Sequence, residues 1–495
     1  MIGRFRSDKT PLVSRVTYNV NTFEGFDAET PASALNTRYC SYGYNIFINS
    51  GKIKKMFGIG DPTYKTSEGT VLLPSLAPYS EQIIKLAYFR RTNPIDDQVL
   101  VYGSGGHVFY ANLCTPQSSY IKIDGIENVG APPEFINYYF EGKDTMLIFW
   151  SGGLSVFDGS NVVTYDQAKP LISACMHFDR VFGIDASNQN TLHFSAQLQP
   201  DKFLPEEGGG SISLMDEGGK LQKIISMGGY LYLFREFSVS RLTAYANPED
   251  YVLTGLFRTH ELIVPGSIAV NNDSVTFFAG NNLYLFNGSS LRKVHPGLTA
   301  LIDSTEYASS CFFNGKYYCA VKLKTEGELI GDESTLGVAY NNGVIVIDSM
   351  TDGEGIFRGA DIVGFLPVLS SKINEIFLVY GNARLYRPGK ITDDGKLYGA
   401  VLPKLWRSPA VNFNDPARVK HLRRVYIKTN TDLSVNVSQD GIESEKRAYG
   451  SMRNSYMIPF NTIGYDFCIS LRGESEDFAV DSMQLVFDFN RRYHP

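Results

Sequence analysis

The sequence predicts an all-β protein: a β-propeller, with seven blades favoured over six, followed by a C-terminal antiparallel β-sandwich. Three observations predict this class. Short apolar runs separated by Gly- and Asn-rich turns recur along most of the chain. Their mean spacing is regular, in the forties of residues. No long amphipathic helical pattern interrupts them, which favours a fold made almost entirely of strands.

The clearest unit is Ser267–Val294, which reads as four strands joined by three tight turns. Its strands are Ser267–Val270, Ser274–Ala279, Leu283–Phe286 and Leu291–Val294. Bulky residues occupy consecutive positions in the two middle strands, so we expect both faces of this sheet to be buried. A sheet this small can hide two faces only when it is stacked between similar sheets.

Copies of this unit occur along the chain. Thr145–Tyr165 aligns with Ser274–Val294 without a gap, and every turn falls on a turn. Similar hairpins are Gln98–Ala111, Glu375–Gly389, Arg180–Ala196, Gly229–Tyr245 and Gly315–Asp348. Hairpin starts near 98, 145, 181, 229, 274, 316 and 375 fit the period of about 40–50 residues of four-stranded propeller blades. The alternative is a β-sandwich protein with Gly-rich turns.

Three regions follow from this pattern. Residues 1–80 are an N-terminal arm and a closing hairpin: 1–40 lack periodicity and are expected to dock on another molecule. The hairpin Tyr42–Gly60 either supplies the strand that closes the ring or lies outside the ring, and a Pro/Ser/Thr-rich connector, 62–80, follows it. The propeller spans 81–390.

The last region, 395–495, is predicted as a separate β-sandwich. Its expected strands are Lys420–Lys428, Leu433–Gln439, Ser455–Phe460, Tyr465–Arg472 and Phe478–Phe489. Two polar stretches interrupt the propeller, a Gly-rich one at Gln199–Lys220 and an acidic one at Lys324–Gly337. Insertions are tolerated best on an exposed rim, so we expect both to project from one, the Gly-rich stretch as a mobile loop.

Composition excludes several classes. The 495-residue chain is 43% hydrophobic, with a formal charge of −6 and a pI near 5.8, which disfavours a nucleic-acid binder. The six cysteines show no metal-type spacing, and a turn at Asn314-Gly315 sets Cys311 opposite Tyr318 rather than Cys319. Free thiols, with no secretion signal or membrane-spanning run in the sequence, lead us to expect folding in a cytoplasm.

Catalytic signatures are missing from the sequence. The seven histidines are dispersed, and neither a Walker loop nor a GxSxG elbow occurs. The acidic segments Asp393–Gly395 and Asp348–Glu354 have turn chemistry rather than the alternating oxygens of a calcium loop. We therefore predict no catalytic, cofactor-binding or metal-ligating residue. Carboxylates from separate blades could still form a glycosidase site around the channel, and a linear sequence does not reveal such a set.

Both ends of the chain carry motifs. Phe23-Glu24-Gly25-Phe26 precedes the segment NIFINSGKIKKMFG at Asn45–Gly58. Near the other end, Trp406–Phe413 is followed by Val419–Ile427 and a late strand ending Phe487-Asp488-Phe489. These segments resemble the tail hub, or nozzle, proteins of short-tailed bacteriophages, including the type called packaged-DNA stabilisation proteins.

The resemblance implies a structural virion protein and not an enzyme. Such proteins form a homo-oligomeric ring, commonly of six copies, as a head–tail connector part below the portal and its adaptor. Portal-adaptor proteins and distal fibre or needle proteins are the implied partners, and double-stranded DNA passes through the lumen during genome ejection without sequence recognition. The virion tail, assembled in the host cytoplasm, is the implied location.

Two other functions remain open from the sequence. One is a tail-associated propeller that binds or cleaves glycans. The other is an intracellular kelch-like scaffold, since Ser151-Gly152-Gly153 and Met227-Gly228-Gly229 imitate the kelch double glycine. Kelch blades each need a Trp, however, and the chain has only two, Trp150 and Trp406.

Overall fold

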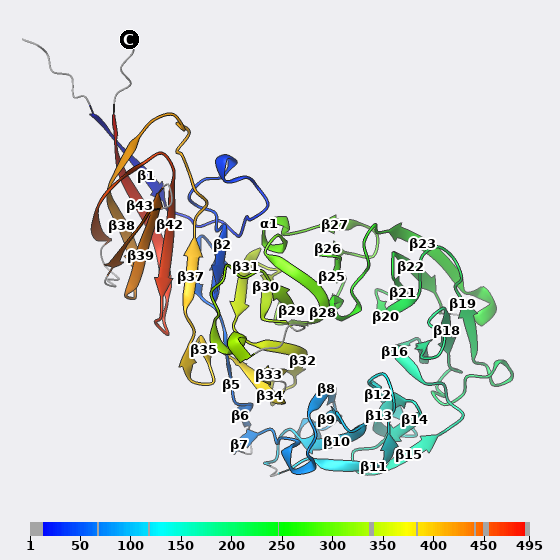
Figure 1. Ribbon diagram of the computed structural model, residues 1–495. Helices are drawn as coiled ribbons and strands as arrows, with labels where there is room; N and C mark the ends of the chain where they lie inside the picture. Colours follow the sequence, from blue (N-terminus) through cyan, green and yellow to red (C-terminus); the bar gives the residue numbers. More distant parts are fainter. Residues whose placement is uncertain are drawn as a thin grey trace, which may run out of the picture.

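The computed structural model describes residues 13–66, 69–116, 119–245, 247–335, 341–382, 385–439, 442–448 and 455–490. These residues form a ring of β-sheets with a β-sandwich standing against one side of it (Figure 1). The all-β class, the propeller and the sandwich are therefore confirmed. No helix in the described ranges is long and apolar enough to cross a membrane.

Seven antiparallel blades of four strands make up the ring, and in blades 1 to 6 the four strands are hydrogen-bonded in sequence order. Blades 1 to 3 are β8 (Ile83–Phe89), β9 (Gln98–Gly103), β10 (His107–Asn112), β11 (Ile121–Glu127); β12 (Glu134–Phe140), β13 (Lys143–Trp150), β14 (Gly153–Phe157), β15 (Val162–Tyr165); and β16 (Leu171–His177), β17 (Arg180–Asp185), β18 (Thr191–Phe194), β19 (Gly210–Ser213).

Blades 4 to 7 continue around the ring. They are β20 (Leu221–Met227), β21 (Tyr230–Arg235), β22 (Ser238–Thr243), β23 (Val252–Arg258); β24 (Ala269–Asn271), β25 (Ser274–Ala279), β26 (Asn282–Phe286), β27 (Leu291–Lys293); β28 (Ile302–Phe313), β29 (Lys316–Leu323), β30 (Gly343–Asp348), β31 (Gly353–Arg358); and β32 (Asp361–Leu369), β33 (Asn374–Asn382), β34 (Leu385–Thr392) with β5 (Gly58–Gly60). Each hairpin predicted within 81–390 is the middle pair of a blade.

Blade 5 shows why the blades stack. Phe277 and Phe278 are adjacent in β25 and both have no exposed surface. The ring of Phe277 packs against Phe234 of blade 4, with centroids 5.3 Å apart, whereas Phe278 belongs to the core shared with blade 6 and the sandwich. Both faces of the sheet are therefore buried between neighbours, as its sequence predicts.

The N-terminal segment closes the ring, which is one of the two places expected for the hairpin Tyr42–Gly60. Its last strand, β5, pairs antiparallel with β34, with Ile59 opposite Ile391. Two other strands of this segment, β3 (Ile46–Asn49) and β4 (Lys52–Lys55), instead extend blade 6 through pairing of β3 with β31. Blade 7 then packs against blade 1 through β32 and β8.

Two sheets form the sandwich. One is β1 (Val13–Val20), β43 (Ala479–Asn490), β38 (Lys420–Thr429) and β41 (Tyr456–Gly464); the other is β2 (Tyr42–Tyr44), β37 (Lys404–Arg407), β42 (Phe467–Gly473), β39 (Leu433–Gln439) and β40 (Ile442–Ala448). The five predicted strands are present. The sequence missed β40, IESEKRA, because its side chains are mostly exposed and charged and give no apolar alternation.

The prediction that residues 1–40 dock on another molecule is wrong for the described part. Val13–Val20 is a strand of the sandwich, paired along its whole length with β43. After it, Phe23 and Phe26 are buried in the main core. This pairing joins residues near opposite ends of the chain, so no local pattern predicts it. Residues 1–12 lie outside the described ranges.

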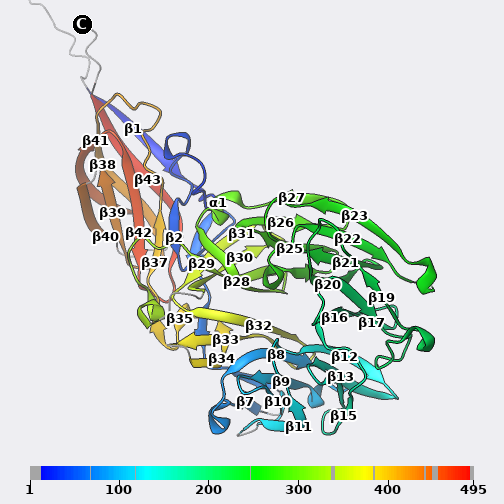
Figure 2. The same cartoon turned by 45° about the vertical axis from the view of Figure 1, so that its right-hand side comes forward.

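The sandwich is also not a separate module. The boundaries near 81 and 395 agree with where β8 begins and β34 ends, but β4 pairs with β43. Blade 6, β3, β4 and one sandwich sheet thus form a single ten-stranded sheet. In both Figure 1 and Figure 2 the sandwich lies on the side of the ring where blade 6 is found.

Two predicted loops contain regular structure. In Gln199–Lys220, the residues Gly210–Ser213 form β19, the outer strand of blade 3, so this stretch is not simply a mobile loop. With one apolar residue in four, GSIS has no strand pattern of its own. In the connector, β6 (Thr63–Thr66) and β7 (Gly69–Leu72) form a hairpin that buries Tyr64 and Val71.

Short elements complete the described part. They are α1 (Pro296–Thr299) and the strand pair β35 (Lys396–Leu397) and β36 (Ala400–Val401). The 3-10 turns are η1 (Ala32–Ala34), η2 (Ala77–Tyr79), η3 (Pro94–Asp96), η4 (Pro205–Glu207), η5 (Pro248–Asp250), η6 (Pro265–Ser267) and η7 (Gly331–Thr335). None of them interrupts the stacking of the blades.

Candidate functional site

The joint between propeller and sandwich is made from residues 23–58, 324–335 and 402–408. At its centre the guanidinium of Arg358, at the end of β31, meets the carboxylate of Glu333. Arg358 Nε and Nη2 donate to the two Glu333 oxygens at 2.6 and 2.8 Å, and Nη1 donates to Tyr42 Oη at 2.8 Å. Both charged side chains are almost fully buried. Each buried charge therefore has a counter-ion and hydrogen-bond partners, without which its burial would cost free energy.

The acidic insert forms part of this joint, so the prediction that it projects from a rim is wrong for residues 324–335. Glu328 pairs with Arg472 at 3.1 Å and accepts a hydrogen bond from Tyr44 Oη at 3.0 Å. Glu326 pairs with Arg407. Both arginines belong to the sandwich, so the acidic residues of this blade face basic residues of the other module.

The N-terminal motif is also built into the joint. A side chain at Gly25 would overlap the Glu354 carboxylate, and the next backbone N–H, of Phe26, donates to that carboxylate. The other Glu354 oxygen lies 2.8 Å from His295 Nδ1. Glycine at position 25 therefore allows the chain to approach a buried carboxylate that fixes the segment against blade 6.

Asn45 has a comparable role. Its backbone has a φ of +56°, which Asn tolerates better than most residues. The side-chain Oδ1 accepts from Arg358 N at 2.8 Å, and Nδ2 donates to Pro403 O at 2.9 Å. One amide thus bridges blade 6 and the start of the sandwich.

The two ends of the chain touch at the joint. The ring of Phe23 packs edge-on against Trp406, with centroids 5.2 Å apart, and both side chains are buried. Two residues after Trp406, Ser408 Oγ accepts from Ile469 N at 3.0 Å. The motif residues at both ends are therefore structural contacts of one joint.

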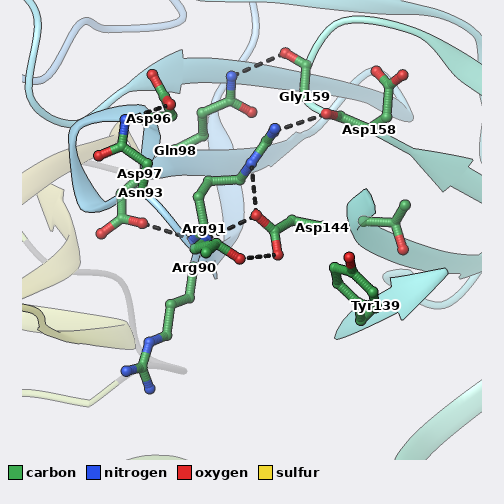
Figure 3. Close-up of polar contacts among 12 residues, drawn as sticks. Arg90, Arg91, Asn93, Asp96, Asp97, Gln98, Tyr139, Asp144, Asp158 and Gly159 are labelled. Carbon is green, nitrogen blue, oxygen red and sulfur yellow. Dashed lines mark hydrogen bonds and ion pairs between the residues drawn. The ribbon is translucent and has the colours of Figure 1, made fainter. Parts of the chain in front are cut away.

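A charged cavity lies between blades 1, 2 and 7. Its volume is about 350 Å³, and it is lined by Arg90, Arg91, Thr92, Pro94, Asp97, Asp144, Ser370 and Ser371. The Asp144 carboxylate accepts from Thr92 N at 2.7 Å and from Thr92 Oγ1 at 2.8 Å, with Arg91 Nε 3.8 Å away. Figure 3 shows these contacts, with the Arg90 side chain extending away from them.

The second carboxylate of this cavity, Asp97, is equally occupied. It accepts from Arg91 N and from Tyr88 Oη, both at 2.7 Å. Burial raises the pKa of Asp97, and these hydrogen bonds oppose that rise. Asp97 and Asp144 both accept hydrogen bonds from the loop that follows β8, from Arg91 N and from Thr92 respectively. The two carboxylates therefore hold this loop in place.

An aromatic cavity opens between blades 2, 3 and 4. Its volume is about 710 Å³, and it is lined by Asn137, Tyr138, Tyr139, Met176, His177, Phe178, Asp179, Leu198, Ser226 and Gly229. Burial lowers the pKa of His177, whose Nδ1 lies 2.8 Å from Ser226 Oγ. This cavity was not predicted from the sequence. The one available signal is Phe178-Asp179, a two-residue hairpin turn without the usual Gly or Asn.

The histidines and cysteines are dispersed over the described part of the chain. No cluster of three His, Cys, Asp or Glu residues suited to a metal occurs in the described ranges. Cys311 lies opposite Tyr318, as the two-residue turn predicts, and Cys319 is therefore on the other face of the sheet. Burial raises the pKa of Cys319 to about 12, so this thiol stays protonated near neutral pH.

The turn predictions are confirmed with one exception. Asp348 accepts from the backbone of Met350 at 2.9 Å and Asp394 accepts from Thr392 Oγ1 at 2.6 Å, as turn residues do. Glu354, in contrast, is the buried joint carboxylate described above.

No protein-family model matches the sequence, and neither does any curated protein sequence. Solved structures with a similar fold include the extracellular domain of a one-component system from B. thetaiotaomicron (10% identity, TM-score 0.44, covering 88% of this chain and 61% of that one). Others are a fungal alcohol oxidase with copper (11%, 0.43, 80% and 91%) and Raptor from Chaetomium thermophilum (10%, 0.41, 63% and 28%). At this level of similarity they bear on neither activity nor partners.

Proposed function

We propose that this protein is a structural component of a bacteriophage virion. It forms a ring of identical copies, six by the family resemblance, in the tail of a short-tailed phage below the portal and its adaptor. The ring is a conduit and a seal: it holds the packaged genome and then lets it pass during ejection. Portal-adaptor proteins bind one side, and fibre or needle proteins bind the other.

The contact between Phe23 and Trp406 carries this proposal. Each residue belongs to one of the two terminal segments that resemble tail hub proteins, and the two rings pack against each other at the joint. Gly25, Phe26 and Asn45 of the same segments hold that joint together. The resemblance therefore rests on residues with a shared structural task, which supports an assembly part over an enzyme.

The continuity of the fold also supports a conduit. A seal around DNA under pressure must not bend between its parts, and here one ten-stranded sheet joins the propeller to the sandwich. The formal charge of −6 favours DNA that passes without adhering, because a strongly basic wall would bind phosphate.

Two measurements test the proposal: the oligomeric state of the purified protein, and its presence and effect in the virion. Native mass spectrometry and class-averaged micrographs of the full chain are expected to show closed rings, and purified virions are expected to contain the protein in the tail. Particles made without it should package DNA and then lose it. A protein that stays monomeric in finished particles, or particles that retain DNA without it, would contradict the proposal.

The proposal includes the absence of catalysis. Purified protein incubated with host capsular or lipopolysaccharide glycans is expected to release no reducing ends above a buffer control. Hydrolysis would instead favour the tail-glycosidase alternative.

A further inference from the structure

Four bulky side chains stand exposed around the aromatic cavity. Tyr139, Phe178, Leu198 and Tyr245 have exposed fractions of 64%, 48%, 61% and 67%. They come from blades 2, 3 and 4. The ring centroids of Phe178 and Tyr245 lie 6.2 Å apart, with an angle of 71° between the ring planes. A soluble protein rarely leaves several large apolar side chains together unless something binds there.

Two of these residues are held in strained backbone. Phe178 has a φ of +44° and Leu198 a φ of +59°, a region that bulky residues seldom adopt. A backbone hydrogen bond from Leu198 N to Asp179 O, at 2.8 Å, ties the two loops together. Strain of this kind is found mainly where a site needs a particular side chain in a particular place.

The loops around the cavity are acidic. Five exposed carboxylates on these loops form no ion pair within the described part of the chain, namely Glu141, Asp179, Glu206, Glu249 and Asp250, whereas the exposed Glu207 pairs with Lys202 at 3.2 Å. An apolar cavity inside an acidic rim fits a partner segment in which basic residues flank an aromatic or aliphatic one.

The sequence contains such a segment. Residues 1–12 read MIGRFRSDKTPL, with Phe5 between Arg4 and Arg6, and the charge of Lys9 balances that of Asp8. This segment precedes β1, which lies in the sandwich, whereas blades 2 to 4 lie on the side of the ring away from the sandwich (Figures 1 and 2). Twelve extended residues span at most about 40 Å. This arrangement favours a neighbouring copy over the same molecule.

We propose that the aromatic cavity binds residues 1–12 of a neighbouring copy. Phe5 enters the cavity between Tyr139 and Phe178, and Arg4 and Arg6 face the acidic rim. This inference rests on the proposed ring, because it names one contact by which adjacent copies are joined. It assigns to the loop face of blades 2 to 4 the role of a receptor for the preceding subunit.

A charge exchange in the full chain tests the contact. Arg4→Glu with Arg6→Glu reverses the charge of the segment. Glu249→Arg with Asp250→Arg reverses the charge of the rim at exposed positions. Each pair alone is expected to raise the concentration for half-maximal ring assembly about tenfold or more, because like charges then meet. All four changes together should restore it to within about threefold of the unaltered chain. The matched control is Asp124→Arg with Glu127→Arg, on the exposed outer strand of blade 1, which should leave assembly unchanged.

Photo-crosslinking locates the segment independently. With benzoylphenylalanine at position 5, the expected product joins two copies through a peptide that contains Phe178 or Tyr245. Rings that form normally with the reversed segment, or crosslinks only within one copy, would overturn this inference and leave the proposed ring intact. Unaltered protein that never forms rings would overturn both. Binding of a saccharide that Tyr139→Ala abolishes, with assembly unaffected, would also overturn it.

Discussion

At the scale of single residues, Arg358 and Glu333 show how a buried charge can serve a joint. Each is almost fully buried, and each finds its partners across the contact between blade 6 and the acidic insert. Such a pair adds little over an apolar contact, but removing one partner leaves the other charge unpaired in the core. The pair therefore fixes which surfaces meet.

Glu333→Gln is expected to lower the free energy of unfolding by about 3–5 kcal/mol, because the Arg358 guanidinium keeps its charge without a counterion. Urea denaturation followed by tryptophan fluorescence measures this, since Trp406 is buried in the joint. The control is Glu328→Gln, whose side chain is 40% exposed and whose ion pair is worth about 1 kcal/mol or less. Equal losses for the two variants would contradict the assignment.

Asp361 gives the protein a predictable pH dependence. Burial raises the pKa of this carboxyl to about 7, and its Oδ1 has no hydrogen-bond partner among the described residues. In the unfolded chain an aspartate titrates near pH 4. Between about pH 4 and 7 the unfolded state therefore loses the proton while the folded state keeps it, so stability falls as the pH rises.

Asp361→Asn removes that titration. The variant should gain stability relative to the unaltered protein at pH 8, by a few kcal/mol at most, and gain less or nothing at pH 4. Thermal unfolding at the two pH values measures the difference. A stability gap between variant and unaltered protein that does not change with pH would show that Asp361 titrates normally.

At the scale of elements, closure of the ring depends on the three-residue strand β5. Its first residue, Gly58, lies so close to Lys396 that a side chain would overlap the Lys396 backbone. The strand can therefore enter blade 7 only with glycine at this position. This contact couples the N-terminal segment to the last blade.

Gly58→Val is expected to destabilise the protein by about 1–3 kcal/mol or more, since the strand must shift to accommodate the side chain. Differential scanning calorimetry reads this as a lower melting temperature. Gly255→Val is the matched control: Gly255 is also a strand residue, and nothing lies within 4 Å of an added Cβ. A control loss as large as that of Gly58→Val would refute the steric explanation.

At the hairpin turn Phe178-Asp179, in contrast, substitution is expected to stabilise the protein. Both residues have positive φ, the geometry in which Asn-Gly is preferred. Replacing them with Asn-Gly should raise the free energy of unfolding by about 1 kcal/mol or more, because strain is relieved. Ring assembly should weaken in the same variant, since the cavity loses its phenyl ring. A variant that is less stable would show that the turn is not strained.

At the scale of the whole molecule, the propeller and the sandwich share one core. Phe278 of blade 5, Ile345 of blade 6 and Val425 of the sandwich belong to the same buried cluster. Scanning calorimetry is therefore expected to show the sandwich unfolding together with blades 5 to 7, without a transition of its own. A separate transition for the sandwich would mean that the joint does not couple the two modules.

The sequence by itself determined the blades. Strand Ser274–Ala279 lies where its turns and apolar run predict it, and Cys311 lies opposite Tyr318 because a two-residue turn fixes the register. These features are local: turn residues, strand length and spacing act over a few positions. Strands with few apolar residues give no such local signal, which is why β19 and β40 were missed.

The positions of the terminal segments and of the buried ion pair depend on tertiary contacts and could not be predicted from the sequence. Val13–Val20 becomes a strand only because β43 offers it an edge, and Glu333 becomes a buried ion-pair partner only because Arg358 arrives from another strand. The aromatic cavity likewise needs three blades to exist. Contacts between residues distant in sequence leave no periodic trace, because each partner is selected by the surface it meets after folding.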